Sequence, residues 1–527
     1  MKKIDYHVFL DKVHGCWYGK CLGGAAGAPV EGIKRIIEID DFTEIFNPDL
    51  PNDDLDIQLL WLDVLENKGT NITSCDLADA WVEKCWYPFS EYGYFLKNYM
   101  RGIKPPYSGI VNNAFFKEGM GCPIRSEIWG IISAGNPELA AKYAYMDATL
   151  DHAGNSVYAE QFLAVIESMA FFMDDMEELV RIGLSYVPSE SKLYQCIKEV
   201  LDTYKAKDWK SIRADILKKY SHPDFTNVVQ NLGFVVIALL CGEGDMRKTI
   251  NIALQCGYDT DCTCASAASV VGIIKGYLGL GEELTSLIND YFVIGIDVTR
   301  PSNSIRQLAE DSVNIALKTP NFEMQIEGTV CERPQDMIQI VPVTEEGYFN
   351  ALHSVNPIRW QLYGPYFEAY NMPLAERNPK AMRDDMVYVV NNQVEFDKCY
   401  LKKDDQPVGV IESYEDIIEV DKYVSMQGQM CIYLKTELML EEDRDVWALI
   451  GNTDGFKFWC NEEEVMSKDE IRLYTPYNNF VLLHLKKGCN KLMLKLLRRT
   501  DQMTFAIGFR LYEGCHWHWS KWCTDLI

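Results

Sequence analysis

The chain has 527 residues, more than one ordinary domain requires, so its length predicts two or three hydrophobic cores. Hydrophobic residues make up 48% and charged residues 24%, which excludes a chain that is disordered or collagen-like as a whole. Asp and Glu number 77 against 51 Lys and Arg. The resulting net charge of −26 argues against binding to nucleic acid or to an anionic membrane surface.

The N-terminal residues carry Asp5 and Asp11 where a secretory signal has its apolar run. The longest apolar stretches, such as 234–241, are too short to cross a bilayer. Seventeen cysteines without a signal peptide indicate reduced thiols, and we therefore expect a cytoplasmic protein. Cys262 and Cys264 form a close pair that no CxxC pair accompanies, which argues against a cysteine-rich zinc site.

The hydrophobic pattern from Ile4 to about Leu317 is that of amphipathic helices separated by short Gly, Pro and Asn signals. The clearest predicted helices cover 54–66, 158–172, 189–204, 232–240 and 304–317. This part of the chain therefore predicts an all-α domain over 1–320.

Beyond about Thr319 the pattern changes to short apolar or alternating runs separated by turn residues. These predicted strands cover 337–343, 386–396, 430–440, 445–452, 456–460, 480–485 and 491–497. The pattern is typical of a β-sandwich, so we expect an all-β accessory domain over 335–527 and a boundary between 321 and 335.

The first predicted helix contains glycine at every fourth position: Gly15, Gly19, Gly23 and Gly27. On a helix this spacing makes one smooth face, which predicts close packing against another backbone. Gly19-Lys20 lacks the Ser or Thr that follows in a phosphate-binding loop, so nucleotide binding of that kind is disfavoured. Pro29 ends the pattern, and Glu31 follows it.

Two acidic pairs stand at predicted helix starts. Asp53 and Asp54 are the first pair, and helix capping is their simplest explanation, although adjacent carboxylates also suit Mg²⁺ or Ca²⁺. Asp259 and Asp261 are the second pair, in a turn before a helix with a face of small residues. Carboxylates brought together in one interior repel one another, so their convergence would imply one or two bound divalent cations.

These segments, together and in this order, resemble the ADP-ribosylglycohydrolase family over about residues 10–315. The family's opening GDAxGAPxE stretch corresponds to 23–31, its TDDT motif to 52–55 and its closing GxDTDT motif to 257–262. The resemblance implies an all-α, largely orthogonal bundle that binds the ribose of its substrate over two Mg²⁺ ions.

The resemblance also implies roles for individual residues. The implied metal ligands are Asn52, Asp53, Asp54, Asp259 and Asp261, and the implied catalytic residues are Glu31, Asp53, Asp54 and Asp259. Arg125 lies in a stretch similar to the family's Gly-rich substrate loop. We treat it as a candidate substrate-binding residue, with a structural ion pair as the alternative.

His152 and Asn155 are the other candidate substrate-binding residues, in a polar segment that also fits a simple capping loop. Three positions depart from the family pattern. Asn52 stands for a family Thr and keeps a side-chain oxygen, Cys262 stands for another Thr, and Gly24 stands for an Asp. Sulfur is a poor ligand for a hard cation, so Cys262 places one coordination position in question.

The sequence therefore predicts a Mg²⁺-dependent glycohydrolase that cleaves an ADP-ribosyl or similar ribosyl linkage with a metal-positioned water. Two alternatives stay open: a glycosidase acting on another carbohydrate, and a non-catalytic binder of ADP-ribose or sugar. Segments 452–461 and 485–492 of the second domain resemble the jelly-roll sandwiches appended to bacterial carbohydrate-active enzymes. We expect a small-molecule, ADP-ribosylated or glycosylated substrate and no nucleic-acid or membrane partner; an oligomer is possible.

Overall fold

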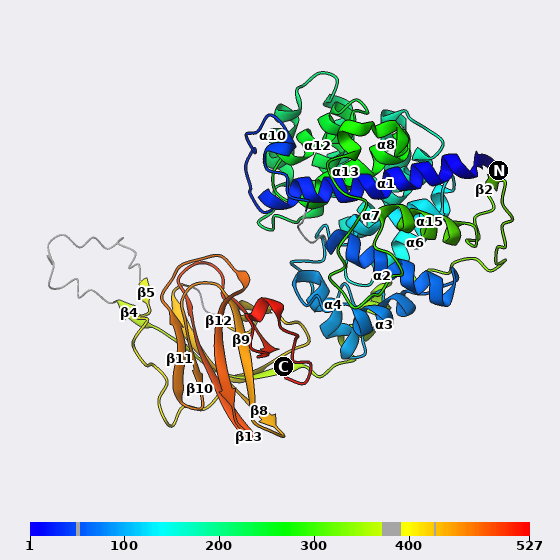
Figure 1. Ribbon diagram of the computed structural model, residues 1–527. Helices are drawn as coiled ribbons and strands as arrows, with labels where there is room; N and C mark the ends of the chain where they lie inside the picture. The colour runs from blue at the N-terminus through cyan, green and yellow to red at the C-terminus, as the bar shows by residue number, and fades with distance from the viewer. Residues whose placement is uncertain (49–52, 371–390, 426–427, 527) are drawn as a thin grey trace. The chain divides into compact units, whose positions relative to one another are not determined.

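The computed structural model describes residues 1–48, 53–370, 391–425 and 428–526, with the backbone alone at 53, 369, 370 and 391. The chain forms two compact units (Figure 1). One comprises Met1–Tyr99 and Ile103–Glu345, and the other comprises Met100–Gly102 and Glu346–Ile527. The predicted domains, 1–320 and 335–527, have their boundary earlier in the chain than Glu345, where the first unit ends. Among the described helices, none has both the length and the apolar character needed to span a bilayer.

The first unit is helical. Its α-helices are α1 (Tyr6–Gly27), α2 (Asp53–Lys68), α3 (Ser74–Lys84), α4 (Ser90–Met100), α5 (Glu127–Ile132), α6 (Pro137–Ala148), α7 (Asn155–Ala170), α8 (Met176–Leu184), α9 (Lys192–Thr203), α10 (Trp209–Tyr220), α11 (Val228–Cys241), α12 (Met246–Gln255), α13 (Thr260–Lys275), α14 (Glu282–Thr285) and α15 (Ile305–Ala316). The predicted helices correspond to α2, α7, α9, α11 and α15, and the prediction of an all-α region is confirmed.

The N-terminal strand β1 (Lys2–Asp5) pairs in parallel with β2 (Met324–Glu327), the segment that follows the last helix of the bundle. Residues beyond 320 thus return to the start of the chain and belong to the helical unit. Asp5 then begins α1 as an N-cap, since its side chain accepts from the backbone N–H groups of His7 and Val8 at 2.8 and 3.2 Å.

Helices α1 and α13 cross with their backbones in contact, as the glycine spacing predicts (Figure 1). A Cβ atom added at Gly15, Gly19, Gly23 or Gly27 would lie 2.1–2.4 Å from a carbonyl oxygen of α13. Those oxygens belong, in the same order, to Gly272, Ala268, Cys264 and Thr260. The pairing runs in opposite directions along the two helices, so the C-terminus of α1 meets the N-terminus of α13.

The second unit contains most of α16 (Glu345–Leu352) and is built mainly from strands. These are β3 (Ile358–Tyr366), β4 (Glu368–Tyr370), β5 (Asn391–Gln393), β6 (Gly409–Ser413), β7 (Ile418–Glu419), β8 (Met430–Leu440), β9 (Arg444–Asn452), β10 (Phe456–Cys460), β11 (Glu463–Lys468), β12 (Thr475–Leu485), β13 (Gly488–Arg498) and β14 (Thr504–Leu511). One sheet has the order β11-β10-β13-β8-β3-β6, and another has the order β12-β9-β14-β7.

All strand pairs of these two sheets are antiparallel, and apolar residues of both sheets share one core. The predicted sandwich-like domain is therefore confirmed, and the predicted strands at 430–440, 445–452, 456–460, 480–485 and 491–497 lie within β8, β9, β10, β12 and β13. Of the predicted strand 386–396, residues 386–390 lie outside the described part of the chain.

The predicted strand at 337–343 is wrong, because this fully described stretch contains no strand. Its backbone bonds to a side chain of the helical unit instead: the Tyr145 hydroxyl donates to the Val341 carbonyl at 3.2 Å and accepts from the Val343 N–H at 3.3 Å. Pro342 between them has no N–H to donate to a sheet. Strands β3 and β14 are not among the predicted strands, although each is paired on both sides within its sheet.

Candidate functional site

The loop after α1 and the turn before α13 are joined by backbone hydrogen bonds. The Gly32 N–H donates to the Tyr258 carbonyl at 2.7 Å, and the Tyr258 N–H donates to the Ile33 carbonyl at 2.9 Å. Tyr258 has a left-handed φ of 70°, an uncommon conformation for a non-glycine residue that is often found at functional sites. This strained connection brings Glu31 to the start of α13.

Three carboxylates meet at this junction. Oxygen atoms of Glu31, Asp259 and Asp261 all lie within 4.8 Å of one another. Asp259 occupies the N-cap position of α13, but its side chain makes no capping hydrogen bond within the described chain. Asp259 and Asp261 are buried, whereas Glu31 is exposed, so the group opens to solvent at Glu31.

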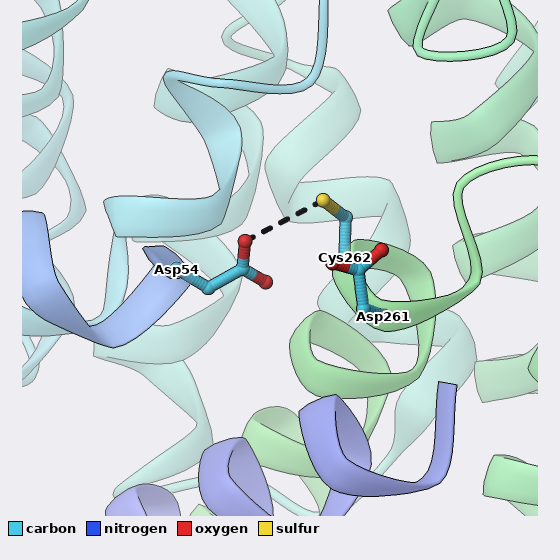
Figure 2. A group of neighbouring side chains, drawn as sticks. All are labelled: Asp54, Asp261 and Cys262. Carbon is cyan, nitrogen blue, oxygen red and sulfur yellow. Dashed lines mark hydrogen bonds between the residues drawn. The ribbon is translucent and has the colours of Figure 1, made fainter. Parts of the chain in front are cut away.

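The fourth carboxylate comes from α2. Oxygen or sulfur atoms of Asp54, Asp261 and Cys262 also lie within 4.8 Å of one another, and all three residues are buried. Figure 2 shows Asp54 extending from α2 toward the first turn of α13, where the Cys262 thiol donates to Asp54 Oδ1 at 3.5 Å. The structure thus brings together Glu31, Asp54, Asp259 and Asp261 from three separate segments; we call these residues and Cys262 the acidic cluster.

The predicted ligands Asn52 and Asp53 cannot be placed in the cluster in the same way. Asn52 lies outside the described residues, and only the backbone of Asp53, the first residue of α2, is described. Their roles as metal ligands stay predictions from the family resemblance.

A buried lysine lies beside the acidic cluster, and the sequence analysis did not assign it a role. Lys20 of α1 is fully buried, with its Nζ 3.6 Å from Asp54 Oδ2 and 3.2 Å from Glu127 Oε1. Burial alone would lower the pKa of Lys20, but the charges of Glu127 and Asp54 outweigh it and raise that pKa above its ordinary value. Lys20 stands among small and apolar residues in the second half of α1, and this is the signal that could have indicated a buried acidic partner.

Glu127 is held in turn by neighbours on α2 and α13. Its Oε2 accepts from Gln58 at 2.8 Å, and its Oε1 accepts from Ser269 at 2.8 Å. Lys20 also donates to the Ile124 carbonyl at 2.5 Å. This network holds the Lys20 ammonium in place, and the ammonium in turn helps to position Asp54 Oδ2.

The acidic cluster has an excess of negative charge. Burial, together with the charges of Asp261 and Glu31, raises the pKa of Asp259 well above its ordinary value. No hydrogen bond from a described residue satisfies the buried Oδ2 of Asp259, whose residue is only 2% exposed. Oxygen-rich, negatively charged surroundings of this kind suit a divalent cation, so the residues present fit the metal that the sequence predicts.

Arg125 lies in the interior and is bound by two other carboxylates. Its Nε donates to Asp147 Oδ1 at 2.8 Å, and its two terminal nitrogens donate to both oxygens of Asp151 at 2.7 and 2.9 Å. All three side chains are fully buried. The structure therefore joins Arg125 to Asp147 and Asp151, and does not bring it into the acidic cluster.

Replacement of Arg125 by Met is expected to destabilise the protein by about 3 to 5 kcal/mol, because it removes the buried cation that Asp147 and Asp151 share and leaves Asp151 with His152 alone. Urea unfolding measures this loss. The matched control is Arg359→Met in the β unit, where the ion pair with Glu412 is exposed and should contribute less than about 1 kcal/mol. Unchanged stability with weakened substrate binding would instead support the sequence-based role of Arg125.

His152 binds the same carboxylate as Arg125. Its Nδ1 lies 2.7 Å from Asp151 Oδ1 and its Nε2 lies 3.3 Å from Glu91 Oε1, in a fully buried position. Burial lowers the pKa of His152, but Asp151 and Glu91 outweigh it and raise that pKa from 6.5 to about 9. The histidine is thus charged at neutral pH and belongs to the buried ion-pair network.

The raised pKa of His152 predicts a loss of stability in alkaline solution. The protonated ring stabilises the fold fully below pH 6.5, and this contribution is lost as the pH rises through about 9. The difference between 6.5 and about 9 corresponds to a loss on the order of 3 kcal/mol. Urea unfolding of the wild type and of His152→Gln across this range measures the effect. The variant should lose much of the slope, and an equal slope in both proteins would contradict the assignment.

Asn155, the first residue of α7, connects two other segments. Its Nδ2 donates to Glu118 Oε1 at 2.9 Å, and its Oδ1 accepts from the Leu193 N–H at 3.1 Å. The structure gives Asn155 a clear positional role, and its predicted part in substrate binding stays untested.

The fold and site define a class: a helical protein with a carboxylate-lined site suited to divalent cations, followed by a sandwich-like β domain. The sequence profile of the ADP-ribosylglycohydrolase family matches residues 5–320. The chain belongs to this family, as the motifs at 23–31, 52–55 and 257–262 predict. No curated protein matches the chain.

Several solved structures are also similar to parts of the chain. An ADP-ribosylglycohydrolase-related protein complex is 17% identical over 59% of this chain and 98% of that chain, with a TM-score of 0.42. The PA14 domain of the antifreeze protein MpAFP is 10% identical over 32% of this chain and 88% of that chain, with a TM-score of 0.20. The β-glucosidase from Kluyveromyces marxianus in complex with glucose is 15% identical over 21% of this chain and 14% of that chain, with a TM-score of 0.18.

Proposed function

We propose that the helical unit is a Mg²⁺-dependent glycohydrolase that cleaves an ADP-ribosyl, or similar ribosyl, glycosidic linkage. The observation that carries the proposal is the convergence of Glu31, Asp54, Asp259 and Asp261 in a chain of this family. Asp259 and Asp261 are the principal ligands, and Asp54, with Asn52 and Asp53 as expected from the motif, completes the set. When bound, the cations supply Lewis acidity that orients vicinal hydroxyls of the sugar and polarises a water.

In this proposal, Glu31 is the group that assists proton transfer. It is the exposed member of the acidic cluster, while its carboxylate lies within 4.8 Å of ligand atoms of Asp259 and Asp261. It can therefore accept a proton from water as the water oxygen bonds to the anomeric carbon and the bond to the leaving group breaks. The leaving group takes the electron pair of the broken bond and receives a proton from Glu31 or from solvent. The buried carboxylates stabilise the positive charge of an oxocarbenium-like transition state.

The test is product analysis by mass spectrometry. The purified protein is incubated with a mixed pool of ADP-ribosylated peptides and oligosaccharides, once with Mg²⁺ and once with a chelator. The proposal predicts that free ADP-ribose is released only with Mg²⁺. Cleavage of neither substrate, with binding of ADP-ribose or sugar, would identify a non-catalytic binder.

A second candidate function is the hydrolysis of another glycoside at the same site. It is favoured by the replacement of the motif's Asp and Thr by Gly24 and Cys262 and by the appended β unit. Release of a sugar from the pool, with the ADP-ribosylated peptides intact, would support this candidate against the first.

A further inference from the structure

The acidic cluster consists of two groups of ligand atoms that differ in chemistry and share Asp261. The first, Glu31 with Asp259 and Asp261, offers only carboxylate oxygens. The second, Asp54 with Asp261 and Cys262, offers oxygens and one sulfur (Figure 2). Mg²⁺ requires hard oxygen ligands, whereas a thiolate favours borderline or soft metals such as Zn²⁺.

The geometry of the second group fits such a metal. A zinc ion that is bound tetrahedrally by a thiolate at about 2.3 Å and a carboxylate oxygen at about 2.1 Å requires the sulfur and oxygen to lie about 3.6 Å apart. Cys262 Sγ and Asp54 Oδ1 lie 3.5 Å apart, and Asp261 offers a further carboxylate oxygen to the same group. The side chains are therefore close to the required separation before any cation binds.

Two further observations indicate that the acidic cluster is built for cations. Asp259 is only 2% exposed, and no described residue donates a hydrogen bond to its Oδ2. Lys20 lies 3.6 Å from Asp54 Oδ2, but it also neutralises Glu127 at 3.2 Å. Buried groups of like charge require opposite charges to balance them. The single charge of Lys20 is therefore too small to balance the carboxylates of the cluster.

We propose that Asp54, Asp261 and Cys262 bind a divalent transition-metal ion of borderline softness, represented by Zn²⁺, with the Cys262 thiolate as a ligand. The inference rests on the proposed function and deepens it: Asp259 and Asp261 bind Mg²⁺, with Glu31 beside them as the proton-transfer group. Asp261 belongs to both groups of ligand atoms, so the chain holds a mixed pair of cations. Cys264 takes no part, since its thiol donates to the Ile250 carbonyl at 3.7 Å. The ligand set is therefore no cysteine-rich zinc site, in agreement with the sequence spacing.

The direct test is a spectroscopic titration with Co²⁺, a probe for zinc sites, on the metal-free full-length protein in the presence of Mg²⁺. A near-ultraviolet charge-transfer band from thiolate to Co²⁺ is expected in the wild type and in the matched control Cys264→Ser. The band should be absent in Cys262→Ser and Cys262→Thr. Circular dichroism of each variant confirms that the fold is retained.

Metal analysis after dialysis provides the second readout. The wild type and Cys264→Ser should retain one Zn²⁺ more than Cys262→Thr, whose Zn²⁺ affinity should fall by more than about 100-fold. Asp261→Asn, which leaves the thiol in place, should weaken the band independently. A charge-transfer band that persists in Cys262→Ser, or its absence from the wild type, would overturn the inference.

These outcomes are separable from the fate of the proposed function. A Cys262-dependent band in a protein that releases no ADP-ribose would support the metal assignment and contradict the proposed substrate. Release of ADP-ribose at full rate with Mg²⁺ alone, and without such a band, would contradict the mixed metal pair and support the proposed function.

Discussion

Asp259→Asn is expected to lower Mg²⁺-dependent turnover by at least about 100-fold while the protein stays folded. Asp259 contributes ligand oxygens to the acidic cluster, and its N-cap position on α13 does not depend on a side-chain capping bond within the described chain. The substitution removes one negative charge from a group that repels its neighbours. The metal-free variant should therefore unfold at a temperature equal to or above that of the metal-free wild type.

Thermal unfolding with and without Mg²⁺, together with an activity assay, measures these effects. Mg²⁺ should raise the unfolding temperature of the wild type and have little effect on Asp259→Asn. Asp56→Asn is the matched control on α2, because Asp56 is buried but accepts from the Gly295 N–H at 2.9 Å and from the Tyr87 hydroxyl at 2.5 Å. This control should lose stability and keep its response to Mg²⁺. Full activity in Asp259→Asn would refute the metal site.

Gly27→Ala is expected to destabilise the helical unit by about 3 kcal/mol, the upper end of the usual cost of overpacking, and to weaken cation binding. Its new Cβ would lie 2.1 Å from the Thr260 carbonyl oxygen, where neither backbone can yield easily. The Thr260 hydroxyl also donates to the Gly27 carbonyl at 2.7 Å. Separation of α1 from α13 at this end would move Glu31 away from Asp259 and Asp261.

Urea unfolding and Mg²⁺ titration of Gly27→Ala test this account of the crossing. Gly279→Ala is the matched control, because its new Cβ would lie 3.5 Å from the Lys275 Cβ, an ordinary van der Waals contact. The control should differ from the wild type by less than about 1 kcal/mol. Equal stability of the two variants would show that the close approach of α1 and α13 is not required.

The sequence was sufficient to predict features that depend on local spacing. The glycines from Gly15 to Gly27 predicted a close helix crossing, and the structure provides the partner in α13. The DxD spacing of Asp259 and Asp261 predicted carboxylates that converge, which they do. The residues of such a pattern lie on neighbouring turns of one helix or in one loop. Their spacing alone therefore determines which of them share a face.

The remaining features depend on which distant residues meet, and local patterns do not specify this. Arg125 was a candidate for substrate binding or for a structural ion pair, and the partners that bind its charge, Asp147 and Asp151, are visible only in the fold. The acidic partners of Lys20, Asp54 and Glu127, lie on other helices, so the sequence around Lys20 does not indicate them. The apolar run 337–343 has the composition of a strand, but the structure pairs it with no strand. Pairing of charges and of strands is decided by the tertiary fold.

The most direct test of the central claim is the release of free ADP-ribose from an ADP-ribosylated peptide, measured side by side for the wild type and Asp259→Asn. Each protein is assayed with Mg²⁺ and with a chelator. The account predicts release only by the wild type and only with Mg²⁺. Equal release by both proteins, or release that the chelator does not reduce, would contradict a role for the acidic cluster as the cation-dependent site of hydrolysis.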